Sequence, residues 1–110
     1  MDEPRIKAGL WVRAALRLAD AGGRPGAVLR RGDADAGGVL VVLRGREGLS
    51  VLSQVRAGAE MSWLRATGPD PVDQATADAY VARQVGRDPD LWVVELEAPD
   101  LLPLFEGRVI

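Results

Sequence analysis

Residues 27–43 read AVLRRGDADAGGVLVVL, which is two apolar runs separated by a charged, glycine-rich segment. The three glycines and two aspartates of segment 30–38 are typical of a turn, because glycine supplies positive φ angles and aspartate caps backbone amides. The second run, 39–43, is apolar at every position, as in a strand covered on both faces. The stretch therefore predicts two antiparallel paired strands, the second in the middle of a sheet, with the loop at one end.

A helix precedes this stretch and two strands follow it. Leu10, Ala14 and Leu18 recur every four residues, with Ile6 one turn earlier and Trp11 and Ala15 beside them. We therefore expect an amphipathic helix from about Ala8 to Ala21 with these side chains on its apolar stripe. After the strand at 39–44, residues 49–55 and 61–67 alternate in polarity, and glycine-containing turns precede both. The sequence thus predicts a four-stranded antiparallel meander.

A second helix and a last strand complete the pattern. Asp70 before Pro71 is a typical helix start, and Gly86 and Pro89 bracket the end. The small apolar residues of this helix are predicted to face the sheet; they are Val72, Ala75, Ala79 and Ala82. Residues 91–97 form the final strand, which we expect to join the sheet. The fold class is α+β, and residues 1–110 form a single globular domain.

The composition excludes several classes of function. The 110 residues include no cysteine and no histidine, which removes disulfides, thiolate chemistry, imidazole bases and the usual zinc sites. The formal net charge is −2, thirteen of the fourteen basic residues are arginine, and no lysine-rich run occurs, so nucleic acid is not an expected partner. No apolar run approaches ~18 residues, which predicts a cytoplasmic protein with no membrane contact. These absences favour a protein that is not an enzyme.

The charged loop is the best candidate for a ligand site. Asp33 and Asp35 could share a divalent cation, with Arg30 and Arg31 neutralising a bound anion. No other cofactor is predicted. The alternative is that both aspartates cap turn amides and pair with neighbouring arginines.

Two further arginines belong to the candidate ligand group, Arg65 and Arg83. Arg65 shares a predicted strand with Trp63, and an arginine on a partly apolar face needs a carboxylate or a ligand. Glu95 on the last strand is the alternative partner, as a cross-strand ion pair. The tryptophans are predicted to be core residues.

The C-terminal tail offers a different kind of site. Its apolar residues Leu101, Leu102, Leu104 and Phe105 are interrupted by a proline, so the tail is expected to fold over the core. If the tail is exposed instead, its apolar residues would form a binding site for a protein partner. We therefore expect a non-enzymatic interaction module that recognises a protein partner or itself through a sheet edge or this tail. The alternative is a small-ligand or metal/anion-binding protein with its site at the Arg30–Gly38 loop.

Several blocks together also resemble one protein family. They are residues 7–12, 30–37, 63–66, 82–84 and 88–95, which read KAGLWV, RRGDADAG, WLRA, ARQ and DPDLWVVE. The chain is similar over nearly its whole length to the small alphaproteobacterial proteins called domain of unknown function 1491. The resemblance implies a small, soluble bacterial protein, and it brings no activity, cofactor or catalytic residue with it.

Overall fold

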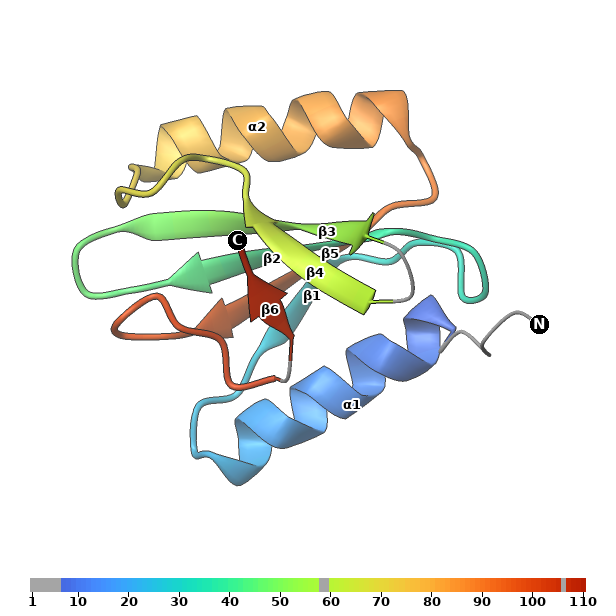
Figure 1. Cartoon of the computed structure of the whole chain (residues 1–110), viewed down its shortest axis with the longest axis horizontal. Coiled ribbons are helices and arrows are strands. Elements are labelled where there is room, and N and C mark those ends of the chain that lie inside the picture. The colour runs from blue at the N-terminus through green and yellow to red at the C-terminus, as the bar shows by residue number, and fades with distance from the viewer. Residues whose placement is uncertain (1–6, 58–59, 106) are drawn as a thin grey trace.

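A mixed sheet of six strands lies between two helices (Figure 1). The computed structural model describes residues 7–57, 60–105 and 107–110. The helices are α1 (Ala8–Ala21) and α2 (Gln74–Arg87). The strands are β1 (Ala27–Arg30), β2 (Val39–Arg44), β3 (Leu49–Ala57), β4 (Glu60–Arg65), β5 (Trp92–Glu97) and β6 (Arg108–Val109). Their order across the sheet is β1-β5-β2-β3-β4-β6.

The apolar run of β2 is central, as its sequence predicts. All residues from Val39 to Leu43 are buried, because α1 covers one face of the sheet and α2 the other. β2 pairs antiparallel with β3, which pairs antiparallel with β4, so three strands of the expected meander are present. The hairpin between β2 and β3 is closed by the amide of Gly45, which donates to the carbonyl of Gly48 over 2.8 Å.

The predicted pairing of β1 with β2 is wrong, because β5 lies between them. β5 is antiparallel to β1 and parallel to β2, so the sheet is mixed. Apolar side chains cover both faces of β5: Trp92, Val94 and Leu96 belong to the core on the α1 side, and Val93 belongs to the core on the α2 side. A strand with two apolar faces is stable only in the interior of a sheet, which explains its position.

Helix α1 has the expected bounds, but only the Trp11 and Ala15 side of the predicted stripe faces the core, and Ile6 lies outside the described residues. Its buried residues are Ala8, Gly9, Val12, Ala15 and Ala19, whereas Leu10, Ala14 and Leu18 are exposed. Small side chains on the inner face let the helix lie close to the sheet, and the half-buried Trp11 and Leu16 also pack against the core.

Helix α2 begins three residues later than predicted. Asp73, and not Asp70, is the N-cap, and its Oδ1 accepts from the amide of Thr76 over 2.8 Å. The preceding residue, Val72, exchanges two backbone hydrogen bonds of 2.8 Å with Leu49, which keeps the chain extended up to the cap.

The buried face of α2 also differs from the prediction. Ala77 is buried, and Tyr80, Val81 and Val85 pack on the core around it. The alanines at positions 75, 79 and 82 are exposed. The stripe of small residues is therefore the outer face of this helix.

The C-terminal tail folds over the α1 side of the core, as expected. Phe105 is buried beside Trp11 and Trp63, with ring centroids 5.0–5.1 Å apart in all three pairs. β6, which the sequence does not predict, then adds to β4 in parallel. The predicted turn at 56–60 includes residues 58–59, which lie outside the described residues. No helix among the described residues is long and apolar enough to cross a membrane.

Candidate functional site

Of the two aspartates in the Arg30–Gly38 loop, only Asp33 is seen to cap the turn among the described residues. Asp33 Oδ1 accepts hydrogen bonds from the amides of Ala36 (2.8 Å) and Asp35 (2.9 Å), and these bonds lower the pKa of the Asp33 carboxyl. The Asp35 carboxylate forms an exposed ion pair of 3.6 Å with Lys7. Within the described ranges, no three histidine, cysteine, aspartate or glutamate side chains come together as a metal site would require.

The loop crosses the start of β5, which explains its composition. The amide of Asp33 donates to the carbonyl of Asp90 over 2.9 Å, and Trp92 Nε1 donates to the carbonyl of Asp33 over 2.7 Å. Gly32 lies so close to this segment that a Cβ atom would come within 2.7 Å of the carbonyl carbon of Leu91. The loop holds β5 in its place between β1 and β2.

The arginines predicted to share a ligand lie in separate places. Arg30 Nη2 donates to the carbonyl of Pro89 over 2.7 Å, at the end of the sheet that carries the loop. Arg65 lies at the opposite end, beside the β2–β3 hairpin. Arg83 is exposed on α2 and makes no ion pair with the described residues.

The ion pair between Arg65 and Glu95, the alternative to a ligand, is absent among the described residues. Glu95 Oε1 accepts from Arg44 Nη2 over 2.6 Å instead. Arg44 and Glu95 belong to neighbouring strands, whereas two strands separate β4 from β5. Arg65 therefore has to be explained by its own surroundings.

The edge strand β1 carries the most open apolar surface near the loop. Its outer edge has no neighbouring strand among the described residues. Val28 and Leu29 are 42% and 55% exposed, and they point to opposite faces of the sheet. Val28 lines a groove beside α1, and Leu29 lines a groove beside α2. Neither helix therefore covers the sheet completely at β1.

The first groove, the α2 groove, lies between β1 and helix α2 and has a volume of about 250 Å³. Its walls are mainly apolar and include Leu29, Val81, Val85 and Val93. Arg30 also lines it, and the Nε atom of Arg30 is buried with no hydrogen-bond partner in the described part of the chain. A buried donor that is left unpaired costs free energy, so the groove favours an acceptor from an incoming chain.

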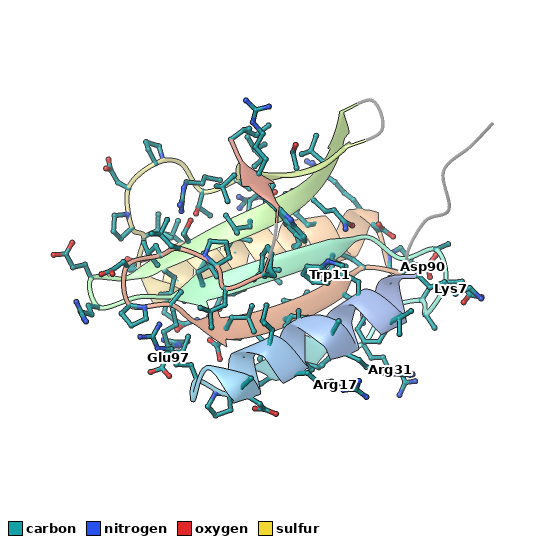
Figure 2. All side chains as sticks on the ribbon, turned by 60° about the horizontal axis from the view of Figure 1, so that its bottom comes forward. Lys7, Trp11, Arg17, Arg31, Asp90 and Glu97 are labelled. Atoms are coloured by element: carbon teal, nitrogen blue, oxygen red, sulfur yellow. The ribbon has the colours of Figure 1, made fainter. Side chains whose placement is uncertain are left out.

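The second groove, the α1 groove, lies between β1 and helix α1 and has a volume of about 260 Å³. Val28, Leu16 and Trp92 form its apolar part, and Arg13 and Arg31 form its rim. Both arginines are exposed and make no ion pair with the described residues. In Figure 2, Arg17 and Arg31 extend on the same side of α1, which adds to the positive charge there.

The sequence points to a sheet edge in general terms but does not identify these grooves. It predicts β1 as the partner of β2 and does not say where β5 lies, so the grooves beside β1 do not follow from it. The signal that could have found the site is the length of the loop, because nine residues are more than a tight hairpin turn requires.

The structure divides the predicted tail site. Phe105 belongs to the core, and Leu101 packs against it half-buried. Leu102 and Leu104 are exposed, and Leu104 lies against the end of α1 at Gly22. Leu102 and Leu104 are therefore the tail residues that remain open to a partner.

Comparison with known proteins gives one consistent result. A family model described as "Protein of unknown function (DUF1491)" matches residues 6–106, and no curated protein matches. A crystal structure of a DUF1491 family protein from Caulobacter crescentus CB15 is similar at 35% identity and a TM-score of 0.84, over 96% of this chain and 100% of that one.

Two solution structures agree with this result. The NMR structure of a DUF1491 family protein from Caulobacter crescentus CB15 has 34% identity and a TM-score of 0.84, over 98% of this chain and 99% of that one. Protein Atu0922 from A. tumefaciens has 26% identity and a TM-score of 0.81, over 97% and 98%. The chain therefore belongs to the DUF1491 family.

Proposed function

We propose that this protein is an interaction module that binds an extended segment of another protein at the open edge of β1. The observation that carries the proposal is the position of Val28 and Leu29, each of which lines an unfilled groove on its own face of the sheet. A strand added beside β1 would place alternate side chains in the two grooves. This is the geometry of β-strand addition, in which backbone hydrogen bonds give affinity and pockets for alternate side chains give specificity.

The grooves define the chemistry of the segment. Side chains that enter the α2 groove should be aliphatic, since Leu29, Val81 and Val85 surround them. Side chains that enter the α1 groove should be acidic, since Arg13 and Arg31 lie at its rim without carboxylate partners among the described residues. The partner segment is therefore an extended strand in which acidic and aliphatic residues alternate.

A second copy of this chain fits the edge poorly. Two β1 strands in antiparallel contact would bring two sets of Arg13 and Arg31 to one interface, and like charges in contact are unfavourable. The register of β1 on β5 is also irregular between Val28 and Arg30. Such a bulge twists an edge strand and discourages extended self-pairing, so a partner strand pairs over a short stretch and groove filling adds to the affinity.

The test is a titration with a blocked heptapeptide in which glutamate and isoleucine alternate. We expect changes in the amide NMR signals of Ala27–Arg30 and a Kd in the range of about 10–500 μM, as for a small transient interface. Leu29→Lys should weaken binding at least about tenfold, because it places a charge in the apolar groove. Leu64→Lys is the matched control, since Leu64 is a similarly exposed leucine (45%) on β4.

Three outcomes would contradict the proposal. The first is binding of a peptide of the same composition with its acidic and aliphatic residues in separate blocks, at equal affinity. The second is equal weakening by Leu29→Lys and Leu64→Lys. The third is a stable dimer in sedimentation experiments that Leu29→Lys dissociates, because the edge would then belong to a second copy.

A further inference from the structure

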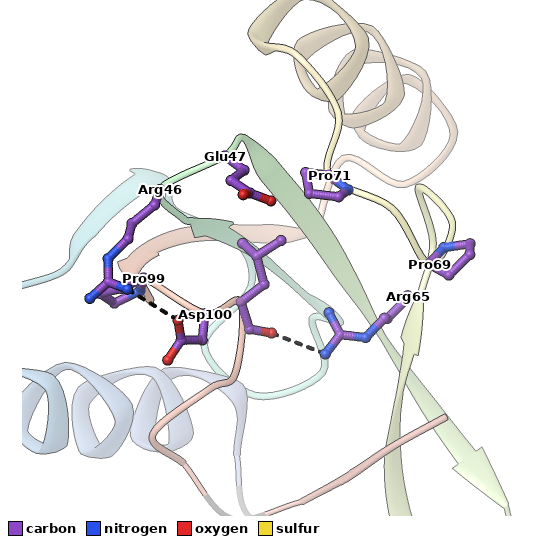
Figure 3. Close-up of a pocket in the computed structure, with 8 residues that line it drawn as sticks. Arg46, Glu47, Arg65, Pro69, Pro71, Pro99 and Asp100 are labelled. Atoms are coloured by element: carbon purple, nitrogen blue, oxygen red, sulfur yellow. Dashed lines mark hydrogen bonds and ion pairs between the residues drawn. The ribbon is translucent and has the colours of Figure 1, made fainter.

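A cavity of about 480 Å³ opens at the end of the sheet away from the loop (Figure 3). The β2–β3 hairpin, the segment between β4 and α2, and the turn that follows β5 surround it. Its volume lies within the range of about 300–1,000 Å³ that is usual for small-molecule sites. The residues that line it include charges of both signs and three prolines.

Arg65 supplies an unbalanced positive charge to this cavity. Its side chain is half-buried; Nη2 donates to the carbonyl of Leu101 over 3.0 Å, and Nη1 donates to the buried Ser50 hydroxyl over 3.4 Å. It forms no ion pair with the described carboxylates. A guanidinium has five N–H donors, so donors remain for a ligand. A partly desolvated cation without a counter-ion favours a bound anion, and an arginine favours a forked contact with a carboxylate.

Glu47 supplies the opposite charge. Two more charged side chains line the cavity, Arg46 and Asp100. They form an ion pair of 3.5 Å and neutralise one another. Glu47 is exposed and makes no ion pair within the described part of the chain. Figure 3 shows Glu47 and Arg65 entering the cavity from different elements, the hairpin and the end of β4. Among the described residues, the cavity thus offers one cation and one carboxylate that form no ion pair.

The walls between these two charges are apolar and rigid. Pro69 lies next to Arg65, and Pro71 lies on the side of Glu47 (Figure 3). The fixed φ angle of proline limits the movement of both. Leu101 has a φ of 56°, which is rare for a bulky residue, and this conformation brings its carbonyl to Arg65. A guanidinium held in advance loses less entropy when a ligand binds.

We propose that this cavity binds a small zwitterion of the α-amino-acid class. The ligand carboxylate contacts Arg65, the ammonium group faces Glu47, and an aliphatic side chain lies against Leu101 and the prolines. This site is separate from the β1 edge and does not depend on the proposed function.

L-leucine is the first probe, with 4-methylpentanoate and 3-methylbutylamine as the analogues that lack one charge each. We expect L-leucine to shift the amide NMR signals of Arg65 and Leu101 with a Kd in the low millimolar range, or about −4 kcal/mol. The carboxylate analogue should bind severalfold more weakly, and the amine should not bind. Arg65→Gln should weaken L-leucine at least about tenfold.

Glu47→Gln keeps the test independent of folding, because Glu47 is exposed and its side chain makes no hydrogen bond or ion pair with the described residues. This variant should weaken the binding of L-leucine by roughly threefold to fivefold, as for an exposed ion pair, and leave the binding of 4-methylpentanoate unchanged. Folded wild-type protein that shows no signal change with L-leucine would overturn the site. Equal effects of Glu47→Gln on both probes would overturn the zwitterion assignment.

Discussion

Gly32→Ala should destabilise the fold strongly, because residue 32 lies against the chain that enters β5. An added Cβ would come within 2.7 Å of both the carbonyl carbon of Leu91 and Cδ1 of Trp92. Backbone atoms cannot move away as the end of a flexible side chain can. The loop must therefore lift from β5, although its φ angles do not themselves require glycine at this position.

The magnitude follows from what the lifted loop loses. The hydrogen bond from Asp33 to Asp90 (2.9 Å) and the bond from Trp92 to Asp33 (2.7 Å) contribute about 1 kcal/mol each. The steric strain of an extra methyl group in a packed site adds about 1–3 kcal/mol. We expect the free energy of unfolding to fall by about 3–5 kcal/mol, and Tm to fall by more than about 10 °C.

Urea denaturation followed by tryptophan fluorescence measures this loss. Gly86→Ala is the matched control: a Cβ there meets nothing within 4 Å, and alanine in a helix is more stable than glycine by about 0.5–1 kcal/mol. The control should therefore unfold at slightly higher urea concentration than the wild type. If Gly32→Ala unfolds at the wild-type midpoint, the loop does not hold β5 as we describe.

Two further predictions concern the cap of α2 and the tail. Asp73→Ala should lower stability at neutral pH and Asp70→Ala should not, because only Asp73 caps the helix. The hydroxyl and the amide of Thr76 lower the pKa of Asp73 by hydrogen bonding, so this contribution is present above the unfolded pKa of about 3.8 and disappears as the pH falls through the lower folded pKa. Thermal melts of both variants from pH 7 to pH 2 check this, and a constant difference across that range would contradict it. Phe105→Ala should cost about 3–5 kcal/mol, since it opens the aromatic cluster, whereas Leu102→Ala, at a side chain 64% exposed, should cost less than about 0.5 kcal/mol. Equal urea midpoints for these two variants would show that the tail does not pack as described.

Local sequence patterns predict which segments form helices and strands better than they predict which strands lie next to each other. β2 is apolar at every position, and only the interior of a sheet satisfies such a strand, so its place could be read directly. The partner of β1 could not be predicted from the sequence, because β1 would fit beside any strand that offers an apolar face. The sequence of β5, apolar on both faces, contained the missing information, but only a comparison of all strands at once would have revealed it.

The helix faces were harder to predict for a different reason. In α1, Leu10, Ala14 and Leu18 have the same periodicity as the smaller residues that are buried, such as Ala15 and Ala19. Periodicity gives candidate stripes, and the distance between helix and sheet decides among them.

The candidate site was predicted in part. The capping role of Asp33 was one of the two interpretations that its sequence allows, and the structure shows those hydrogen bonds. The grooves beside β1 depend on where β1, α1 and α2 lie relative to one another. No single stretch of sequence contains that information.

The position of β5 also determines when this protein can fold. During synthesis, β1 and α1 leave the ribosome early, yet the strand against which both pack is made only at residues 92–97. The N-terminal quarter of the chain must therefore wait, with Val28 and Leu29 unpaired, until nearly all the remaining residues have appeared. Pairing between such distant segments slows folding, and a chain that stops before β5 lacks the strand that pairs with β1.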